Sequence, residues 1–279
     1  MLRFTAALLL TTSPLVAQEF YGTATLSLGQ SQTAGAPVAL QGANGTLMTG
    51  RTDLSFGRLS DTGLYLQADL GLSATNNNNA APNTANTSTN VTLRAGRQTE
   101  RFNYGAFVGA LQSDHDNDAT DDALRMLAGV EGALSLNDRW DFNAHLGYLA
   151  GDSGSDSSAT VTNGIFTGVG IQYAATDRLS LGTSIGYLNA KMDAPLNVVE
   201  LWTLKLRADY DIAALPSMSL FAAAQYGESH QKEVIGADDI TDTTTLMVGL
   251  TYRFGKKAPK TTNLTYLSPY LSNTGSILE

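Results

Sequence analysis

The sequence predicts an all-β fold, a closed antiparallel up-and-down barrel of about twelve strands. Three observations predict it. Polar and apolar residues alternate, the links between the alternating segments are short and long in turn, and aromatic residues gather near both ends of the segments. Near the C-terminal end, Leu246, Val248, Leu250, Tyr252 and Phe254 share one parity. A period of two belongs to a β-strand, whose side chains point alternately to its two faces.

The alternating segments follow one another along the chain from residue 19 onward. Each is long enough for the roughly 9–11 residues that a tilted membrane-spanning strand requires. They cover 19–31, 47–58, 62–75, 89–99, 101–113, 122–136, 139–151, 161–175, 177–191, 198–212, 217–229 and 241–254. Short links such as 60–63 and 136–139 take turns with longer polar links such as 76–88 and 152–160. This regularity favours antiparallel neighbours in a barrel over a soluble sandwich, which has no reason to shorten only one end.

The two faces of each segment differ in chemistry. Trp202, Leu204 and Leu206 lie on one face, whereas Lys205 and Arg207 lie on the other. Because full charges stay on one face, we expect that face to be the wet inner wall of the barrel. The alternation alone also fits a water-soluble sandwich in which the apolar face is buried.

Aromatic residues decide between these two folds. On the apolar parity they form two sets, one near the short links and one near the long links, with aliphatic residues between them. Amphipathic rings prefer the two interfaces of a membrane, so the sets predict two aromatic belts on a transmembrane β-barrel. From Trp140 to Tyr148 the belts are about 20 Å apart, close to the expected apolar band of about 25 Å. The predicted belt residues are Trp140, Tyr148, Tyr173, Tyr187, Trp202, Tyr210, Tyr226, Tyr252 and Phe254.

Residues 1–17 have the layout of a cleavable signal peptide, because Arg3 precedes a short apolar run that ends in a small residue near Ala17. The run is shorter than the roughly 18 residues of a spanning helix, which disfavours the alternative of a retained anchor. The chain has no Cys, and its 26 acidic residues outnumber its 17 Lys and Arg. Since no basic patch is available to neutralise phosphates, we expect no nucleic-acid partner.

The chain resembles the Gram-negative outer-membrane porin-like β-barrels. The residues that carry the resemblance are the signal, the opening strand 21–29, the first hairpin 50–72 and the closing strand 248–254. The resemblance implies a barrel over residues 18–255 in the bacterial cell outer membrane, with outer-membrane lipid and lipopolysaccharide around it. It also implies that the barrel assembly machinery reads the aromatic residue that ends the closing strand, here Phe254.

The chain continues beyond Phe254, which departs from the pattern of that family. Lys256 and Lys257 suit a solvated linker, but the later residues of 256–279 include several Leu and Tyr. Three interpretations remain open for this segment. It is a C-terminal periplasmic tail, a partial plug of the periplasmic mouth, or a strand that binds a partner.

Charged residues of the inner face are the candidates for a selectivity site. Opposite charges on one wall produce a transverse field that orders water and selects solutes, whereas the alternative is salt bridges that only neutralise each other. The candidates are Arg51, Asp53, Asp69, Arg94, Arg125, Glu131, Lys205, Arg207 and Asp209. We expect a channel for passive diffusion of small hydrophilic solutes, and the alternative is a closed structural or adhesive barrel without transport.

The inner charges nearly cancel, so we expect any ion preference to come from the acidic loops of the outer mouth. These loops contain Asp114, Asp116, Asp118, Asp121, Asp122, Asp152, Asp156, Asp238 and Asp239. Such a ring concentrates cations at low ionic strength, which predicts a weak cation preference that fades with salt.

We expect no cofactor apart from Ca²⁺ at the outer acidic loop. Asp114, Asp116 and Asp118 are spaced to offer oxygen ligands, but Ala119 stands where an EF-hand requires Gly, so a solvated loop is the other interpretation. We also expect no enzyme. The three histidines are His115, His145 and His230, and none stands in a recognisable catalytic pattern.

Overall fold

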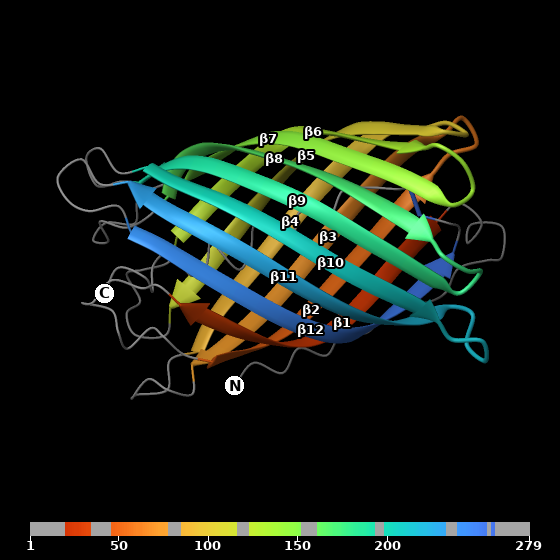
Figure 1. The fold of residues 1–279 in the computed structure, drawn as a ribbon. Coiled ribbons are helices and arrows are strands. Elements are labelled where there is room, and N and C mark those ends of the chain that lie inside the picture. The colour runs from red at the N-terminus through yellow and green to blue at the C-terminus, as the bar shows by residue number, and fades with distance from the viewer. Residues whose placement is uncertain are drawn as a thin grey trace, which may run out of the picture.

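The computed structural model describes residues 20–34, 46–77, 85–115, 123–151, 161–192, 198–232, 239–255 and 258–259. They form twelve antiparallel strands that close into one barrel (Figure 1). No membrane-spanning helix occurs in this part of the chain. The predicted signal peptide lies outside the described residues.

The strands follow the alternating segments of the sequence. Their bounds are β1 Phe20–Ala34, β2 Thr46–Leu59, β3 Leu64–Asn77, β4 Ala85–Gln98, β5 Phe102–His115, β6 Ala123–Ser135, β7 Trp140–Gly151, β8 Val161–Ala174, β9 Leu179–Met192, β10 Val198–Asp211, β11 Met218–Lys232 and β12 Asp239–Gly255. The largest difference from the prediction is the start of β4, which begins at Ala85 rather than at 89. Its first residues extend the ladder because Asn86 pairs with Thr75 of β3.

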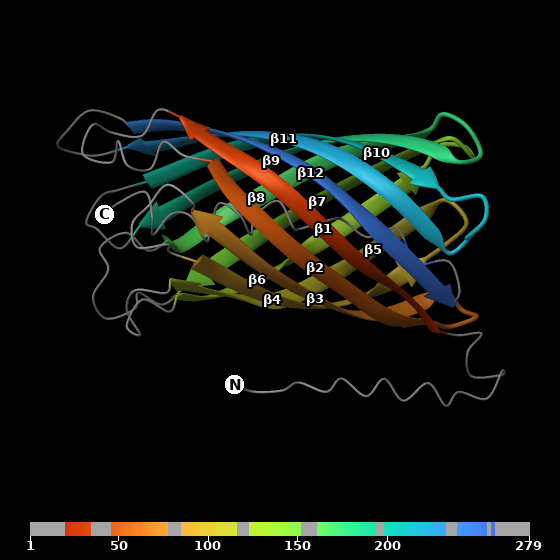
Figure 2. The same ribbon diagram turned by 90° about the horizontal axis from the view of Figure 1, so that it is seen from below.

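The barrel closes through β1, which pairs with both β2 and β12. Leu28 lies opposite Gly50 on one side and opposite Val248 on the other. Figure 2 shows β1 between these two strands, which come from nearly opposite ends of the chain. Closure pairs the backbone of every strand with two neighbours and leaves no free sheet edge.

Tight turns join the strands at one end of the barrel. Asn137 closes the β6–β7 turn, since its Oδ1 accepts the backbone N–H groups of Arg139 and Trp140 at 2.9 and 3.0 Å. Thr176 closes the β8–β9 turn in the same manner. Gly63, with φ at 81°, completes the β2–β3 turn, and a Cβ there would lie 2.1 Å from the carbonyl oxygen of Gln98. Asx and Ser/Thr turns of this kind allow very short links between antiparallel strands.

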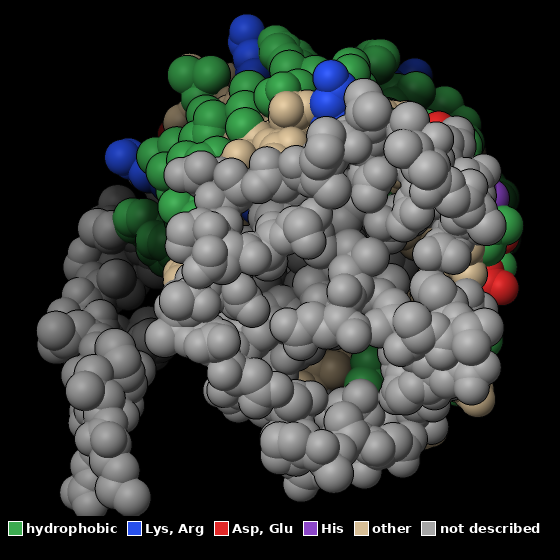
Figure 3. Space-filling view, turned by 90° about the vertical axis from the view of Figure 1, so that its left-hand side faces the viewer, with side chains coloured by type: hydrophobic (Ala, Val, Ile, Leu, Met, Phe, Trp, Pro, Cys, Tyr) green, Lys and Arg blue, Asp and Glu red, His purple; other side chains and the backbone are tan. Residues whose placement is uncertain are grey.

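The outer wall is apolar over its middle. Leu28, Leu206 and Val248 are 68%, 53% and 61% exposed. Figure 3, which faces the long-loop end of the barrel, shows hydrophobic side chains covering the described outer wall. All nine predicted belt residues lie on this outward parity. Trp140 packs on Tyr173 near the short turns and Tyr187 packs on Trp202 near the long loops, with ring centroids 4.5 and 4.4 Å apart.

An apolar cluster fills part of the inner side, which we call the lumen core. Its residues come from inward positions of β5 to β10, toward the long-loop end: Phe107, Leu111, Leu127, Leu149, Phe166, Leu188, Ala190 and Leu201. Phe166 is fully buried and lies over Gly147 of β7, where a Cβ would be 2.3 Å from its ring. The prediction that the whole inner face is wet is therefore wrong for this part of the barrel, because side chains there pack against each other.

Candidate functional site

An ion-paired group on β3, β4 and β6 forms the first charged part of the lumen, which we call the Arg94 cluster (Asp69, Arg94 and Glu131). The Nε atom of Arg94 lies 2.5 Å from Oδ2 of Asp69, and Nη1 of Arg94 bonds Oε2 of Glu131. The Arg94 side chain is buried, and its guanidinium lies 5.7 Å from the centre of the Phe107 ring. A buried guanidinium of this kind requires its carboxylate partners.

Polar side chains extend the Arg94 cluster along the wall to β1. Tyr21 donates its hydroxyl to Oε1 of Gln67 at 3.1 Å, and Nε2 of Gln67 donates to Oδ1 of Asp69 at 2.6 Å. Ser55 donates to the same oxygen at 2.6 Å, and the Tyr65 hydroxyl donates to Glu131 at 3.4 Å. The network therefore connects β1, β2, β3, β4 and β6 on the short-turn side of the lumen.

A second charged group, the Lys205 cluster, consists of Arg51 and Asp53 on β2 and Lys205, Arg207 and Asp209 on β10. Arg51 binds Asp53 through Nε and Nη2 at 2.8 and 2.7 Å. Arg207 binds Asp209 through the same two nitrogens at 2.8 and 2.6 Å. In both pairs the partners are two residues apart on one strand, which places both side chains on the same face.

Two further contacts define the Lys205 cluster. The guanidinium of Arg207 lies 3.8 Å from the centre of the Phe221 ring on β11. Lys205 interacts electrostatically with Arg51 and Asp53, although three strands separate β10 from β2 in the barrel. Lys205 has no ion-pair partner within 4.0 Å among the described side chains, whereas both arginines are bound to their own aspartates.

All nine predicted lumen residues lie on the inward parity of their strands. Eight of them belong to the two clusters. Arg125 stands apart from both, since it lies opposite Leu111 and beside the lumen core, where it is buried. On the neighbouring strands β2, β3 and β4, the four candidates form two separate ion pairs, Arg51 with Asp53 and Arg94 with Asp69.

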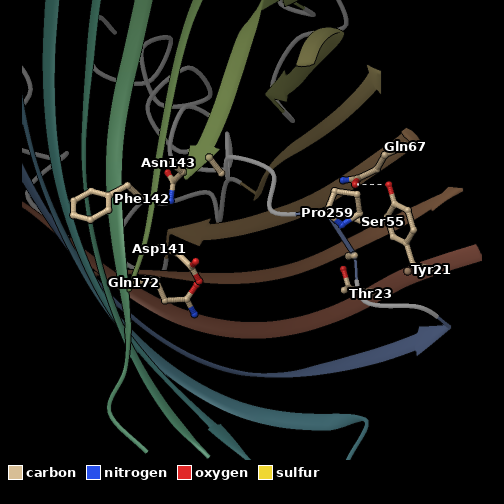
Figure 4. Close-up of a pocket in the computed structure, with 12 residues that line it drawn as sticks. Tyr21, Thr23, Ser55, Gln67, Asp141, Phe142, Asn143, Gln172 and Pro259 are labelled. Carbon is tan, nitrogen blue, oxygen red and sulfur yellow. Dashed lines mark hydrogen bonds between the residues drawn. The ribbon is translucent and has the colours of Figure 1, made fainter. Parts of the chain in front are cut away.

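The short-turn mouth contains a cavity of about 230 Å³ (Figure 4). Gly255, with φ at 75°, ends β12, and Ala258 and Pro259 line the cavity. Pro259 is buried and lies on the Tyr21 and Gln67 side, while Asn143 and Gln172 lie on the opposite wall. The other residues of the segment 256–279 lie outside the described part.

Several residues of the site were not predicted from the sequence. Tyr65 and Gln67 share parity with Asp69, so period two alone could have placed them beside it. The ring of Phe221 under Arg207 gave no such signal, because the two residues come from different strands.

The remaining predicted positions contribute less to the described lumen. Asp116 and Asp118 of the suggested Ca²⁺ loop lie outside the described residues, as does the side chain of Asp114. His145 is buried on the inner face and packs near Phe166, whereas His230 pairs with Glu228 near the long-loop end of β11. These two histidines therefore occupy different sites.

Comparisons with known proteins give a fold and no family. No protein-family model and no curated protein matches the sequence. The chain is similar to the β-domain of the Bordetella autotransporter BrkA, at 12% identity over 85% of this chain and 100% of that one, with a TM-score of 0.52. It is also similar to a mutant of the monoaromatic hydrocarbon channel TodX, at 9% identity over 86% and 91% of the two chains, with a TM-score of 0.50. These likenesses show that the chain shares the closed-barrel fold of both proteins.

Proposed function

We propose that this protein is a channel of the bacterial cell outer membrane through which small hydrophilic solutes diffuse passively, with a weak preference for cations. The observation that carries the proposal is the placement of both charged clusters inside a barrel whose outer wall is apolar. Well-packed apolar residues can replace buried ion pairs at little or no cost in stability. Buried charges are therefore not needed to stabilise the barrel, and a function in the lumen accounts for their presence.

The outer wall supports the membrane location and the expected partners. Its exposed aliphatic residues need a hydrocarbon solvent, and its aromatic rings lie toward both ends as they do at membrane interfaces. Outer-membrane lipid and lipopolysaccharide are the proposed surroundings, and Ca²⁺ at the acidic outer loop would bridge to the anionic lipid. Assembly by the barrel machinery through Phe254 belongs to the same proposal.

The lumen core favours a second candidate, a closed structural or adhesive barrel. Its packed side chains occupy the long-loop half of the β5–β10 wall. A barrel of about twelve strands is wider than one of eight, whose interior is filled by side chains, so we propose that solutes pass along the opposite wall. That wall is lined by hydroxyl pairs such as Ser31 with Thr245 and Ser73 with Ser88, at 2.8 and 2.6 Å.

Reversal potential across a planar bilayer under a salt gradient tests the channel proposal. We expect conductance with a cation bias at low ionic strength, because the acidic outer loops attract cations. The bias should fade near 1 M salt, where the Debye length falls to about 3 Å. An anion bias would refute the proposed ion preference. Absence of conductance from protein that has folded would favour the closed barrel.

Truncation after Gly255 tests the segment 256–279 as a partial plug. We expect the truncated barrel to fold and to show a higher single-channel conductance, because Ala258 and Pro259 line the short-turn mouth. Truncation after Lys260 is the matched control, since it keeps both residues and should keep the original conductance. Equal conductance in all three proteins would mean that the segment 256–279 is a tail that does not obstruct the mouth. Failure of the shorter protein to assemble would mean that Phe254 is not the assembly signal.

A further inference from the structure

The two charged clusters carry opposite excess charge. The Lys205 cluster has three cations and two carboxylates, whereas the Arg94 cluster has two carboxylates and one guanidinium. In the closed strand order β10 is six strands from β4 in both directions. Lys205 and Arg94 therefore start from opposite sides of the barrel, whereas Arg51 and Asp53 of the Lys205 cluster lie on β2, next to the strand that carries Asp69. The field in the lumen points from the Lys205 cluster toward the Arg94 cluster.

Within the Lys205 cluster, Lys205 is the cation whose hydrogen-bond donors are available to a solute. Arg51 and Arg207 each donate hydrogen bonds from two nitrogens to an aspartate of their own strand. Lys205 carries three donors, and no described carboxylate lies within ion-pair distance of it. Its neighbours in the strand ladder are Ser184 and Gln225, which are uncharged. A single anionic group in the lumen would complete this cluster.

The Arg94 cluster is more open at Asp69 than at Glu131. The side chain of Asp69 is 17% exposed, and that of Glu131 is 3% exposed. Asp69 already accepts hydrogen bonds from Ser55, Gln67 and Arg94. A carboxylate has about four lone-pair positions, so capacity for one further donor remains.

We infer that the lumen selects small zwitterionic solutes of the α-amino-acid kind, with the carboxylate at Lys205 and the ammonium group turned toward Asp69. The inference rests on the proposed channel function and names its solute class. A zwitterion has no net charge, so the acidic outer loops neither repel nor retain it, while its dipole aligns with the field between the two clusters. An anion would meet the repulsion of the acidic outer loops, whereas a cation would pass these loops but would find no partner at Lys205.

Uptake into proteoliposomes of four solutes of similar size at pH 7 tests the inference: alanine, lactate, lactamide and alaninamide, which are zwitterionic, anionic, uncharged and cationic. We expect alanine to enter faster than lactamide through the unmodified protein. Lys205→Met should lower the ratio of alanine to lactamide uptake by roughly three- to tenfold, the usual net worth of one hydrogen bond. Lys205→Arg should retain most of the ratio. Lys191→Met, at an exposed outward lysine of β9, should leave it unchanged.

The ratio cancels differences in the amount of folded protein, because lactamide uptake measures the open barrels in each sample. An unchanged ratio in Lys205→Met would overturn the inference, as would faster entry of lactate than of alanine through the unmodified protein. Lactamide uptake without any preference for alanine would contradict the inferred selection of zwitterions but would leave the channel function standing. Absence of uptake for all four solutes would refute the proposed channel function.

Discussion

Arg94→Met is expected to lower the free energy of unfolding by about 3–5 kcal/mol, the usual cost of removing one partner of a buried ion pair. Arg94 is 4% exposed and bridges Asp69 and Glu131, so the substitution leaves two carboxylates in the wall without their cation. Urea unfolding from lipid vesicles measures the loss, with the fluorescence of Trp140 and Trp202 as the signal.

Two control variants separate the ion pair from the arginine itself. Arg97→Met removes an exposed arginine three residues further along the same strand and should change stability by no more than about 0.5 kcal/mol. Adding Asp69→Asn and Glu131→Gln to Arg94→Met should recover much of the loss, because the uncompensated charges disappear. Equal stability of Arg94→Met and the unmodified protein would mean that Arg94 is solvated rather than paired.

Phe166→Ala is expected to cost about 3–5 kcal/mol, since it removes a fully buried ring from the lumen core and leaves a cavity. The ring packs beside Phe107, with centroids 6.1 Å apart, and covers Gly147. The same urea unfolding experiment measures the loss.

Phe166→Leu is the matched control for the cavity. It keeps most of the apolar volume and should cost less than about 1.5 kcal/mol. A loss below about 0.5 kcal/mol in Phe166→Ala would contradict a packed core, because surface positions show changes of that size. The long-loop half of the lumen would then be open to water on the β5–β10 wall.

Much of this fold is readable from local periodicity. A strand exposes alternate residues to opposite faces, so the spacing of Lys205, Arg207 and Asp209 is sufficient to place them on one wall. The same rule places Trp202 and Leu206 on the outer wall. The number of strands and their turns follows from the alternating lengths of the links.

The lumen core shows where local periodicity stops being sufficient. Phe166 follows Ile165, and Leu149 follows Tyr148, so in each pair one apolar residue points to the outer face of the sheet and the other to the inner face. These doublets signal that both faces are apolar there. They do not specify that the inward members of six strands meet one another, because that contact depends on the curvature of the closed sheet.

The sequence by itself determined the strands, their two faces and the set of charges that point inward, because each of these depends on neighbours a few residues apart. The tertiary structure decided which of those charges meet. Arg94 of β4 pairs with Glu131 of β6, although these strands are not neighbours. Lys205 of β10 interacts electrostatically with Arg51 of β2. Contacts across a lumen depend on closure and strand tilt, which are properties of the whole barrel rather than of any one segment.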